Sequence, residues 1–208
     1  MRKLETKRKI IKNSLKFFAK KGYEGASISE IANETNLTKS SIYSYFSGKE
    51  ELYLSVLDYV LDFHDQYWLD GRKNLPKTFD KNVLYHMLLK AKDTSNQESD
   101  ISIFWKKNQI SPPEDIEHIV NSKIVEAKVS TLRFLEQIFR QGQVEGVIKN
   151  NFEVPYLAIT FYSLIGSASL QHLYGTISNH ELLIETMFEV FWTGIEKRDE
   201  KVPVSHLN

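Results

Sequence analysis

Apolar residues recur every three or four positions along most of the chain, which is the spacing of one face of a helix. Residues 4–21 carry Ile11, Leu15 and Phe18 at this spacing, with lysines on the opposite side and Gly22 at the end. The sequence has no sustained strand-like alternation bounded by hairpin turns. The pattern therefore predicts an all-α fold of about nine helices.

Two short helices are predicted near the N-terminus, each preceded by a hydroxyl residue. Ser27 stands before the first helix, and Glu30 follows three positions later, which is the spacing of a capping box. Thr38 stands before the second helix, over residues 39–45. Asn36 lies between the helices, where a left-handed backbone is expected and Asn tolerates it. Two capped helices around such a turn describe a helix-turn-helix.

The remaining helices are predicted to follow residue 48. One of about twenty residues comes first, and five more cover residues 76–94, 100–110, 113–141, 154–174 and 180–198. The 27 residues between Glu153 and Glu181 contain no Lys, Arg, Asp or Glu, a length that could span a bilayer. Because the segment contains Pro155 and several Ser and Thr residues and lacks a basic flank, we expect it to be buried against other helices.

Charge is distributed unevenly although the net charge is zero. Residues 1–50 hold 11 Lys/Arg and 5 Asp/Glu, while the remaining 158 residues hold 16 and 22. The basic N-terminal segment, followed by an acidic remainder, suggests that residues 1–50 bind a polyanion. The alternative is a basic helix face that is merely solvated.

Composition limits the class of protein and of site. Hydrophobic residues make up 41% of the chain and charged residues 26%, which is ordinary for a folded domain and excludes a disordered chain. The lack of Cys excludes disulfides, a thiol nucleophile and Cys-ligated metals. It also fits the cytoplasm, which we expect to be the location because the basic start resembles no signal peptide.

Sequence motifs of catalysis are absent. The chain has no GxSxG, GxGxxG, GxxxxGK[ST] or HExxH motif, and the single pair Asp115 and His118 is expected to form a surface helix turn. We therefore expect no enzymatic activity, no metal site and no cofactor.

The stretch from about Arg8 to Leu57 resembles the DNA-binding domain of the TetR family of bacterial transcriptional regulators, most specifically in the string from Ser41 to Leu52. The resemblance implies that operator DNA is contacted by Ser27, Thr38, Lys39, Ser40, Ser41, Tyr43, Tyr45 and Lys49. Among these residues Lys39, Ser40 and Ser41 would read bases and the others would contact phosphates. Simpler roles stay open: the tyrosines as core residues, Lys39 as a solvated lysine, and Ser27 and Thr38 as helix caps only.

The resemblance divides the chain into a DNA-binding domain at residues 1–50 and a helical ligand-binding and dimerisation domain at residues 51–208. The last two helices look like the dimer-forming pair of the family, because their apolar stripes could form a four-helix bundle with a second chain. Packing of the same stripes within one chain is the alternative. The residues expected at the interface are Leu157, Phe161, Leu164, Ile165, Gly166, Ser169, Met187, Phe188 and Phe191.

Aromatic and polar residues of the second domain are candidates for a ligand pocket, since pockets are mainly apolar with a few polar groups. They are His64, Tyr67, Trp68, Phe104, Trp105, Phe134, Ile138, Tyr162 and His172. The surplus of aromatic side chains favours a small apolar or aromatic effector, and plain core packing is the alternative for each residue.

The sequence therefore predicts a homodimeric regulator, most simply a repressor that binds a palindromic operator and is released by its ligand. The alternative is a helical small-molecule carrier or enzyme that keeps the N-terminal fold only for packing. Salt-dependent binding to duplex DNA separates the two functions, because the carrier or enzyme should lack it.

Overall fold

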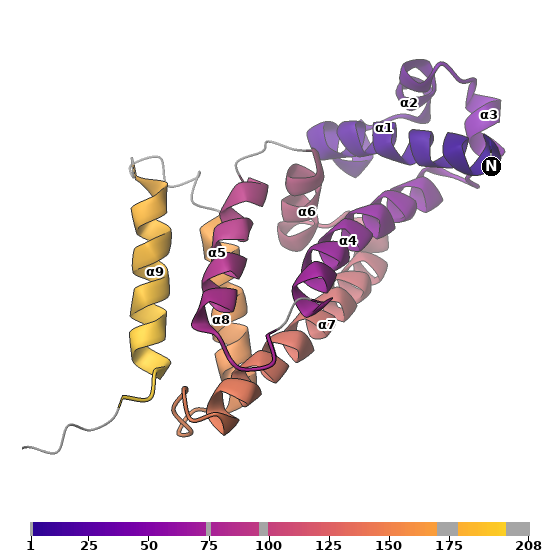
Figure 1. Ribbon diagram of the computed structural model, residues 1–208. Coiled ribbons are helices and arrows are strands. Elements are labelled where there is room, and N and C mark those ends of the chain that lie inside the picture. The colour runs from indigo at the N-terminus through magenta and orange to yellow at the C-terminus, as the bar shows by residue number, and fades with distance from the viewer. Residues whose placement is uncertain (1, 74–75, 96–99, 170–178, 199–208) are drawn as a thin grey trace, which may run out of the picture. The chain divides into compact units, whose positions relative to one another are not determined.

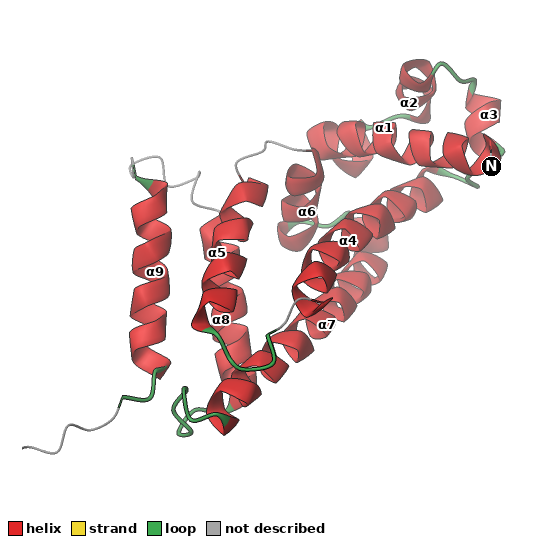
Figure 2. Ribbon diagram, in the orientation of Figure 1, coloured by secondary structure: helices red, strands yellow, loops and turns green. Residues whose placement is uncertain are grey.

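The computed structural model describes residues 2–73, 76–95, 100–169 and 179–198, and helices are the only regular elements in these ranges (Figure 1, Figure 2). In chain order they are α1 (Arg2–Gly25), α2 (Ile28–Thr35), α3 (Lys39–Tyr43), α4 (Lys49–Lys73), α5 (Lys81–Ser95), α6 (Asp100–Ile110), the 3-10 helix η1 (Glu114–Ile116), α7 (Glu117–Val144), α8 (Val154–Ser169) and α9 (His180–Ile195). The all-α class is thus confirmed, and the described ranges contain the expected nine α-helices.

Glycine breaks the first helix where the sequence predicts its end. Gly22 has φ 73° and ψ −178°, so α1 is interrupted there although helical turns continue to Gly25. A positive φ of this size strains any residue with a Cβ, which is why glycine suits the break.

Several helix ends differ from the prediction by a few residues, and contacts outside the helix accompany two of these differences. Helix α5 begins at Lys81, five residues later than expected, since the Phe79 N–H donates to the Glu145 carboxylate at 2.7 Å and Asp80 accepts from the Asn82 N–H at 2.9 Å. The long helix expected from residue 113 starts as η1. Helix α9 ends at Ile195 because Glu196 forms an isolated antiparallel bridge with Ile148.

The chain folds into two compact units. The first consists of residues 1–74 and 93–131, and the second of residues 75–92 and 132–208. In the first unit, α2 and α3 lie on one side of α1 and α4 lies on the other (Figure 1). Apolar side chains from α1 to α4 form its core, which Phe104 of α6 and Val120 of α7 complete.

The second unit is built on contacts between aromatic rings. Phe161 of α8 lies 5.9 Å from Phe139 of α7 and 5.3 Å from Phe191 of α9, measured between ring centroids. Near the end of α7, Gly142 gives room to Phe79 and Ile148, whose side chains would lie within 3 Å of a Cβ at that position. The packing of this unit therefore depends on a residue without a side chain.

The predicted division at residue 50 concerns function and stays a prediction. The compact units follow packing, and the unit that contains the helix-turn-helix also contains α4, α6 and the first half of α7. Residues far apart in the sequence thus share one core with the N-terminal helices.

Candidate nucleic-acid interface

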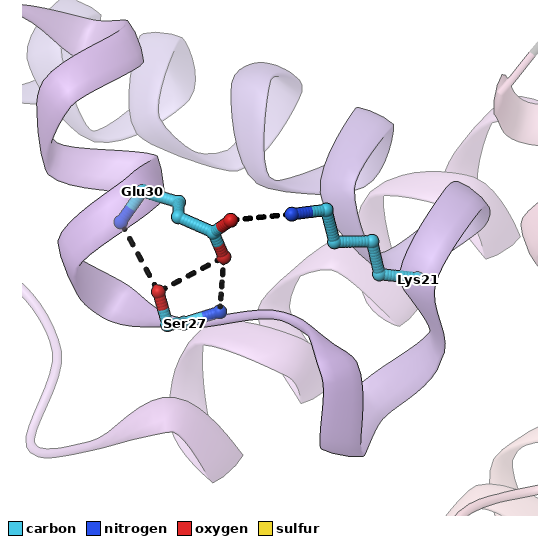
Figure 3. Close-up of polar contacts among 3 residues, drawn as sticks. All are labelled: Lys21, Ser27 and Glu30. Atoms are coloured by element: carbon cyan, nitrogen blue, oxygen red, sulfur yellow. Dashed lines mark hydrogen bonds and ion pairs between the residues drawn. The ribbon is translucent and has the colours of Figure 1, made fainter.

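A capping box begins α2, as its sequence predicts. The Ser27 hydroxyl accepts from the Glu30 N–H at 3.2 Å, and the Glu30 carboxylate accepts from the Ser27 N–H at 3.2 Å and from its hydroxyl at 2.9 Å (Figure 3). The other carboxylate oxygen of Glu30 binds the Lys21 ammonium of α1. These contacts hold the pKa of the Glu30 carboxyl below its usual value, with the Lys21 hydrogen bond as the largest cause. Ser27 is therefore a helix cap, and its contact with a phosphate stays a prediction.

The turn between α2 and α3 has the backbone that the sequence predicts. Asn36 adopts φ 56° and ψ 40°, within the left-handed region. It is the single non-glycine residue with positive φ in the described ranges. The backbone N–H of Leu37 then donates to the Ala32 carbonyl at 2.9 Å. These bonds end α2 and direct the chain into α3.

Hydroxyl groups cluster at the start of α3. The Thr38 hydroxyl accepts from the Ser41 N–H at 3.1 Å and lies 2.9 Å from the Ser40 hydroxyl and 2.8 Å from that of Ser41. Ile42 is fully buried, so one side of the helix packs on the core and the other carries these hydroxyls. Lys39 lies on the exposed side, beside them in sequence.

Tyr43, the last residue of α3, and Tyr45, which follows the helix, differ in their surroundings. Tyr43 is 53% exposed, whereas Tyr45 is half-buried and packs against the core of the first unit. The Lys49 ammonium lies 4.4 Å from the centroid of the Tyr23 ring, in the geometry of a cation–π contact. Packing thus remains an adequate explanation for Tyr45, while Tyr43 presents its side chain to solvent.

Lysines of α1 hold α2 in place, a role for them that differs from the solvated or DNA-facing one expected of the basic N-terminal residues. The Lys16 ammonium pairs with the Glu34 carboxylate at 3.0 Å, and Lys21 pairs with Glu30 in the same way. The Lys9 ammonium donates to the Thr35 carbonyl at 3.4 Å, at the end of α2. Exposed ion pairs stabilise weakly, so their effect here is mainly on orientation. The sequence does contain a signal for these ion pairs, because two neighbouring predicted helices carry opposite charges.

The ligand candidates fall into both units. In the first unit Phe104 is buried, and the rings of His64 and Trp105 lie 4.5 Å apart between centroids. The His64 Nε2 atom is buried without a hydrogen-bond partner, and burial lowers the pKa of its imidazole to about 4. The second unit holds three further candidates: Phe134 and Ile138 are buried, and burial raises the pKa of Tyr162. The role of these residues in ligand binding stays a prediction.

For three ligand candidates the structure does not describe the side chain. Tyr67 and Trp68 belong to α4, but their side chains lie outside the described part of the structure. His172 lies outside the described residues altogether.

Most predicted interface residues of α8 and α9 are covered within one chain. Leu157, Phe161, Ile165 and Phe188 are buried, and Leu164, Met187 and Phe191 are partly buried. Gly166 is exposed, and the side chain of Ser169 lies outside the described part. The burial supports packing within the chain for the four buried residues. Both helices also expose apolar side chains on another face, namely Tyr156, Ile159, Leu182 and Val190.

The described residues contain no group of three or more His, Asp or Glu residues placed to bind a metal ion. Their helices include none that is long and apolar enough to cross a bilayer.

Comparison with known proteins connects this geometry with a family. Residues 10–56 match the sequence model described as "Bacterial regulatory proteins, tetR family". The chain is 35% identical over 118 residues to the uncharacterized HTH-type transcriptional regulator YuxN of Bacillus subtilis (strain 168), covering 54% of this chain and 38% of YuxN. It is 35% identical over 74 residues to the biofilm operon icaADBC HTH-type negative transcriptional regulator IcaR of Staphylococcus epidermidis, covering 31% of this chain and 40% of IcaR. The chain thus spans about two fifths of the length of these curated relatives.

The fold is also similar to that of solved regulators. FadR of Bacillus subtilis, solved in complex with stearoyl-CoA, matches with a TM-score of 0.70 and 21% identity, over 90% of this chain and 98% of FadR. At this identity the likeness concerns the fold. Residues 10–56, which contain the helix-turn-helix, thus match the tetR family of bacterial regulatory proteins, and the chain as a whole has the fold of solved transcriptional regulators.

Proposed function

We propose that the chain is a sequence-specific DNA-binding transcriptional regulator, and that it acts as a repressor. One observation carries the proposal: α3 buries Ile42 and exposes Lys39 and Tyr43, after a left-handed turn at Asn36 that sets its direction. A short helix with small residues and one long cation on its free side suits the major groove. The name of IcaR, a negative transcriptional regulator, supports repression.

The proposed contacts divide by their chemistry. Lys39 is a donor to the guanine acceptors O6 and N7, and the hydroxyls of Ser40 and Ser41 lie close enough to the helix axis to meet base edges. Tyr43 and Lys49 contact phosphates, as do Thr38, Ser27 and Tyr45 with smaller contributions, because their polar groups also serve caps or packing. The DNA-binding domain proposed is residues 1–50.

Dimerisation is proposed through α8 and α9, because one helix-turn-helix per chain reads only one half of a palindrome. The exposed apolar residues of the two helices support this proposal: Tyr156 is 67% exposed and Val190 is 71% exposed. Gly166 lies on the exposed side of α8, and among the described residues a Cβ built there meets no atom within 4 Å beyond the backbone of its own helix. A second chain could therefore approach α8 closely at this point.

Release by a small apolar or aromatic effector completes the proposal. The stearoyl-CoA of FadR, a protein of similar fold, has a long apolar chain, which fits an effector held by aromatic side chains. Such a ligand shifts the equilibrium between two states of the regulator only by the difference in its affinity for them. We also propose that the chain has no catalytic activity and works in the cytoplasm.

Titration of duplex DNA at several salt concentrations tests the proposal against the carrier or enzyme. The regulator should bind a pool of labelled 30-bp random duplexes, with log affinity falling by about 0.9 per phosphate contact for each tenfold rise in salt. Binding that is absent at low salt would contradict the proposal and favour the alternative. Release of the duplex by compounds from an apolar library then tests the effector.

A further inference from the structure

Helix α6 supplies a cation to the broken end of α1. The Lys107 ammonium donates to the Ala19 carbonyl at 2.6 Å and lies 3.3 Å from the Lys20 carbonyl oxygen. Carbonyl groups in the turn before a break lack helical donors, and the break at Gly22 follows two residues later. An ammonium group satisfies such carbonyls and complements the negative end of the helix dipole. Lys107 is thus a C-terminal cap that comes from another helix, α6, which lies beside the end of α1 (Figure 1).

A buried hydrogen bond joins α6 to α4. Asn108 is 1% exposed, and its Oδ1 atom accepts from the Tyr53 hydroxyl at 2.8 Å. Its Nδ2 atom donates to the Phe104 carbonyl in its own helix, also at 2.8 Å. The amide is therefore held by both ends. A buried amide whose partners are both fixed allows one orientation, so this bond sets how α4 lies on α6.

The ring held by Asn108 lies next to the residues proposed to contact DNA. Tyr53 meets Phe18 and Tyr23 of α1 edge-on, at 4.8 Å and 5.0 Å between centroids. The Lys49 ammonium lies over the Tyr23 ring. A chain of contacts therefore runs from Asn108 through two tyrosine rings to Lys49.

We propose that Lys107 and Asn108 are positioning residues for the DNA-contacting helices. Lys107 fixes the end of α1, and Asn108 fixes Tyr53 and, through Tyr53, the Tyr23 ring that holds Lys49. Asn108 follows Tyr53 by 55 residues, so part of the DNA-binding unit lies well beyond the segment that matches the family. The inference rests on the proposed function, since it concerns affinity for DNA. It assigns to α6 a role in that affinity without contact with the nucleic acid.

A double variant separates positioning from stability. Tyr53→Phe and Asn108→Leu each leave one buried polar atom unpaired, so each alone should lower the melting temperature. The double variant removes both atoms, and its melting temperature should recover towards that of the unaltered chain. If the pair positions α4, the folded double variant should still bind about tenfold more weakly to a duplex that the unaltered chain selects from random DNA, which is the loss of one good contact. Fluorescence anisotropy at 25 °C measures this affinity.

Lys107 gives a second test on the surface, where folding is not at risk. Lys107→Met should weaken binding to the same duplex by about three- to tenfold without changing the preferred sequence, and Lys107→Arg should restore it. Lys123→Met is the matched control, because Lys123 pairs with Asp58 across α7 and α4 in the same unit at 2.7 Å. It should stay within about twofold of the unaltered chain.

The outcomes decide each residue separately. Full affinity of the folded double variant overturns the role of Asn108, and full affinity of Lys107→Met overturns the role of Lys107. An equal loss in Lys123→Met overturns the specific role of α6. If the unaltered chain selects no duplex, the proposed function fails and this inference fails with it.

Discussion

Substitution of Asn36 tests the turn on which the helix-turn-helix depends. Its φ of 56° and ψ of 40° cost a residue with an ordinary Cβ about 1–2 kcal/mol, while Asn pays less and Gly nothing in sterics. The backbone bonds around the turn, such as Leu37 N–H to the Ala32 carbonyl at 2.9 Å, are kept by any residue except Pro. The perturbation is therefore confined to backbone preference.

We expect the free energy of unfolding to be highest with Gly or Asn at position 36, lower with Ala and lowest with Val. Asn36→Gly should change it by less than about 0.5 kcal/mol, Asn36→Ala should lower it by about 1 kcal/mol and Asn36→Val by up to about 2 kcal/mol. A loss of about 1 kcal/mol lowers the melting temperature of a chain of this size by about 2–4 °C.

Urea denaturation followed by circular dichroism at 222 nm measures these differences, with the m-value as a check that the unfolded state is unchanged. Affinity for duplex DNA should follow the same order at temperatures where all variants are folded, because the turn directs α3. If Asn36→Val unfolds at the same urea concentration as Asn36→Gly, the left-handed turn does not limit stability and the reasoning is wrong.

Further predictions concern reading, assembly and pH. Lys39→Ala should relax base preference in a selection experiment by about 1–3 kcal/mol at one position, whereas Tyr43→Phe should weaken all duplexes alike, and an unchanged motif in Lys39→Ala would exclude it as a base reader. Gly166→Leu should fold normally, because among the described residues a Cβ there meets no atom within 4 Å outside its own helix backbone, but it should dissociate to monomers in sedimentation at concentrations where the unaltered chain is dimeric; an unchanged dimer moves the interface elsewhere. The pKa of His64 is lowered from 6.5 to about 4, so the unfolded state takes up the proton first and the contribution of His64 to stability is full above pH 6.5 and lost as pH falls towards 4. His64→Phe should therefore lose less stability than His86→Phe, on the exposed side of α5, between pH 6.5 and 4; equal losses contradict a buried neutral imidazole.

Local patterns were the most predictable part of the molecule. The capping box at Ser27 and Glu30, the turn at Asn36 and the break at Gly22 each depend on residues within four positions, and the sequence predicted all three. The predicted start of α5 was five residues too early, because Phe79 is held by Glu145, which lies 66 positions away. A periodic pattern carries no information about such a contact.

The side of a helix that stays exposed was harder to predict. Helices α8 and α9 are apolar on more than one face, so periodicity could not tell whether Phe161 or Tyr156 faces the core, and burial of Phe161 decides it. The contacts of Lys107 and Asn108 could not be predicted, because they join residues far apart in the sequence, as the contact at the start of α5 does. In the sequence, a lysine and an asparagine near the end of a short helix resemble any pair of surface residues. Contacts between residues far apart in the sequence can be assigned only once the fold is known.

Selection of bound sequences from random duplex DNA by the unaltered chain, followed by footprinting on the selected duplex, tests the central claim most directly. We predict enrichment of a palindrome whose half-sites are separated by about one helical turn, 34–36 Å, or a small multiple of it, with both halves protected together. Failure to enrich any sequence, or protection of a single asymmetric half-site, would contradict a dimeric operator-binding regulator.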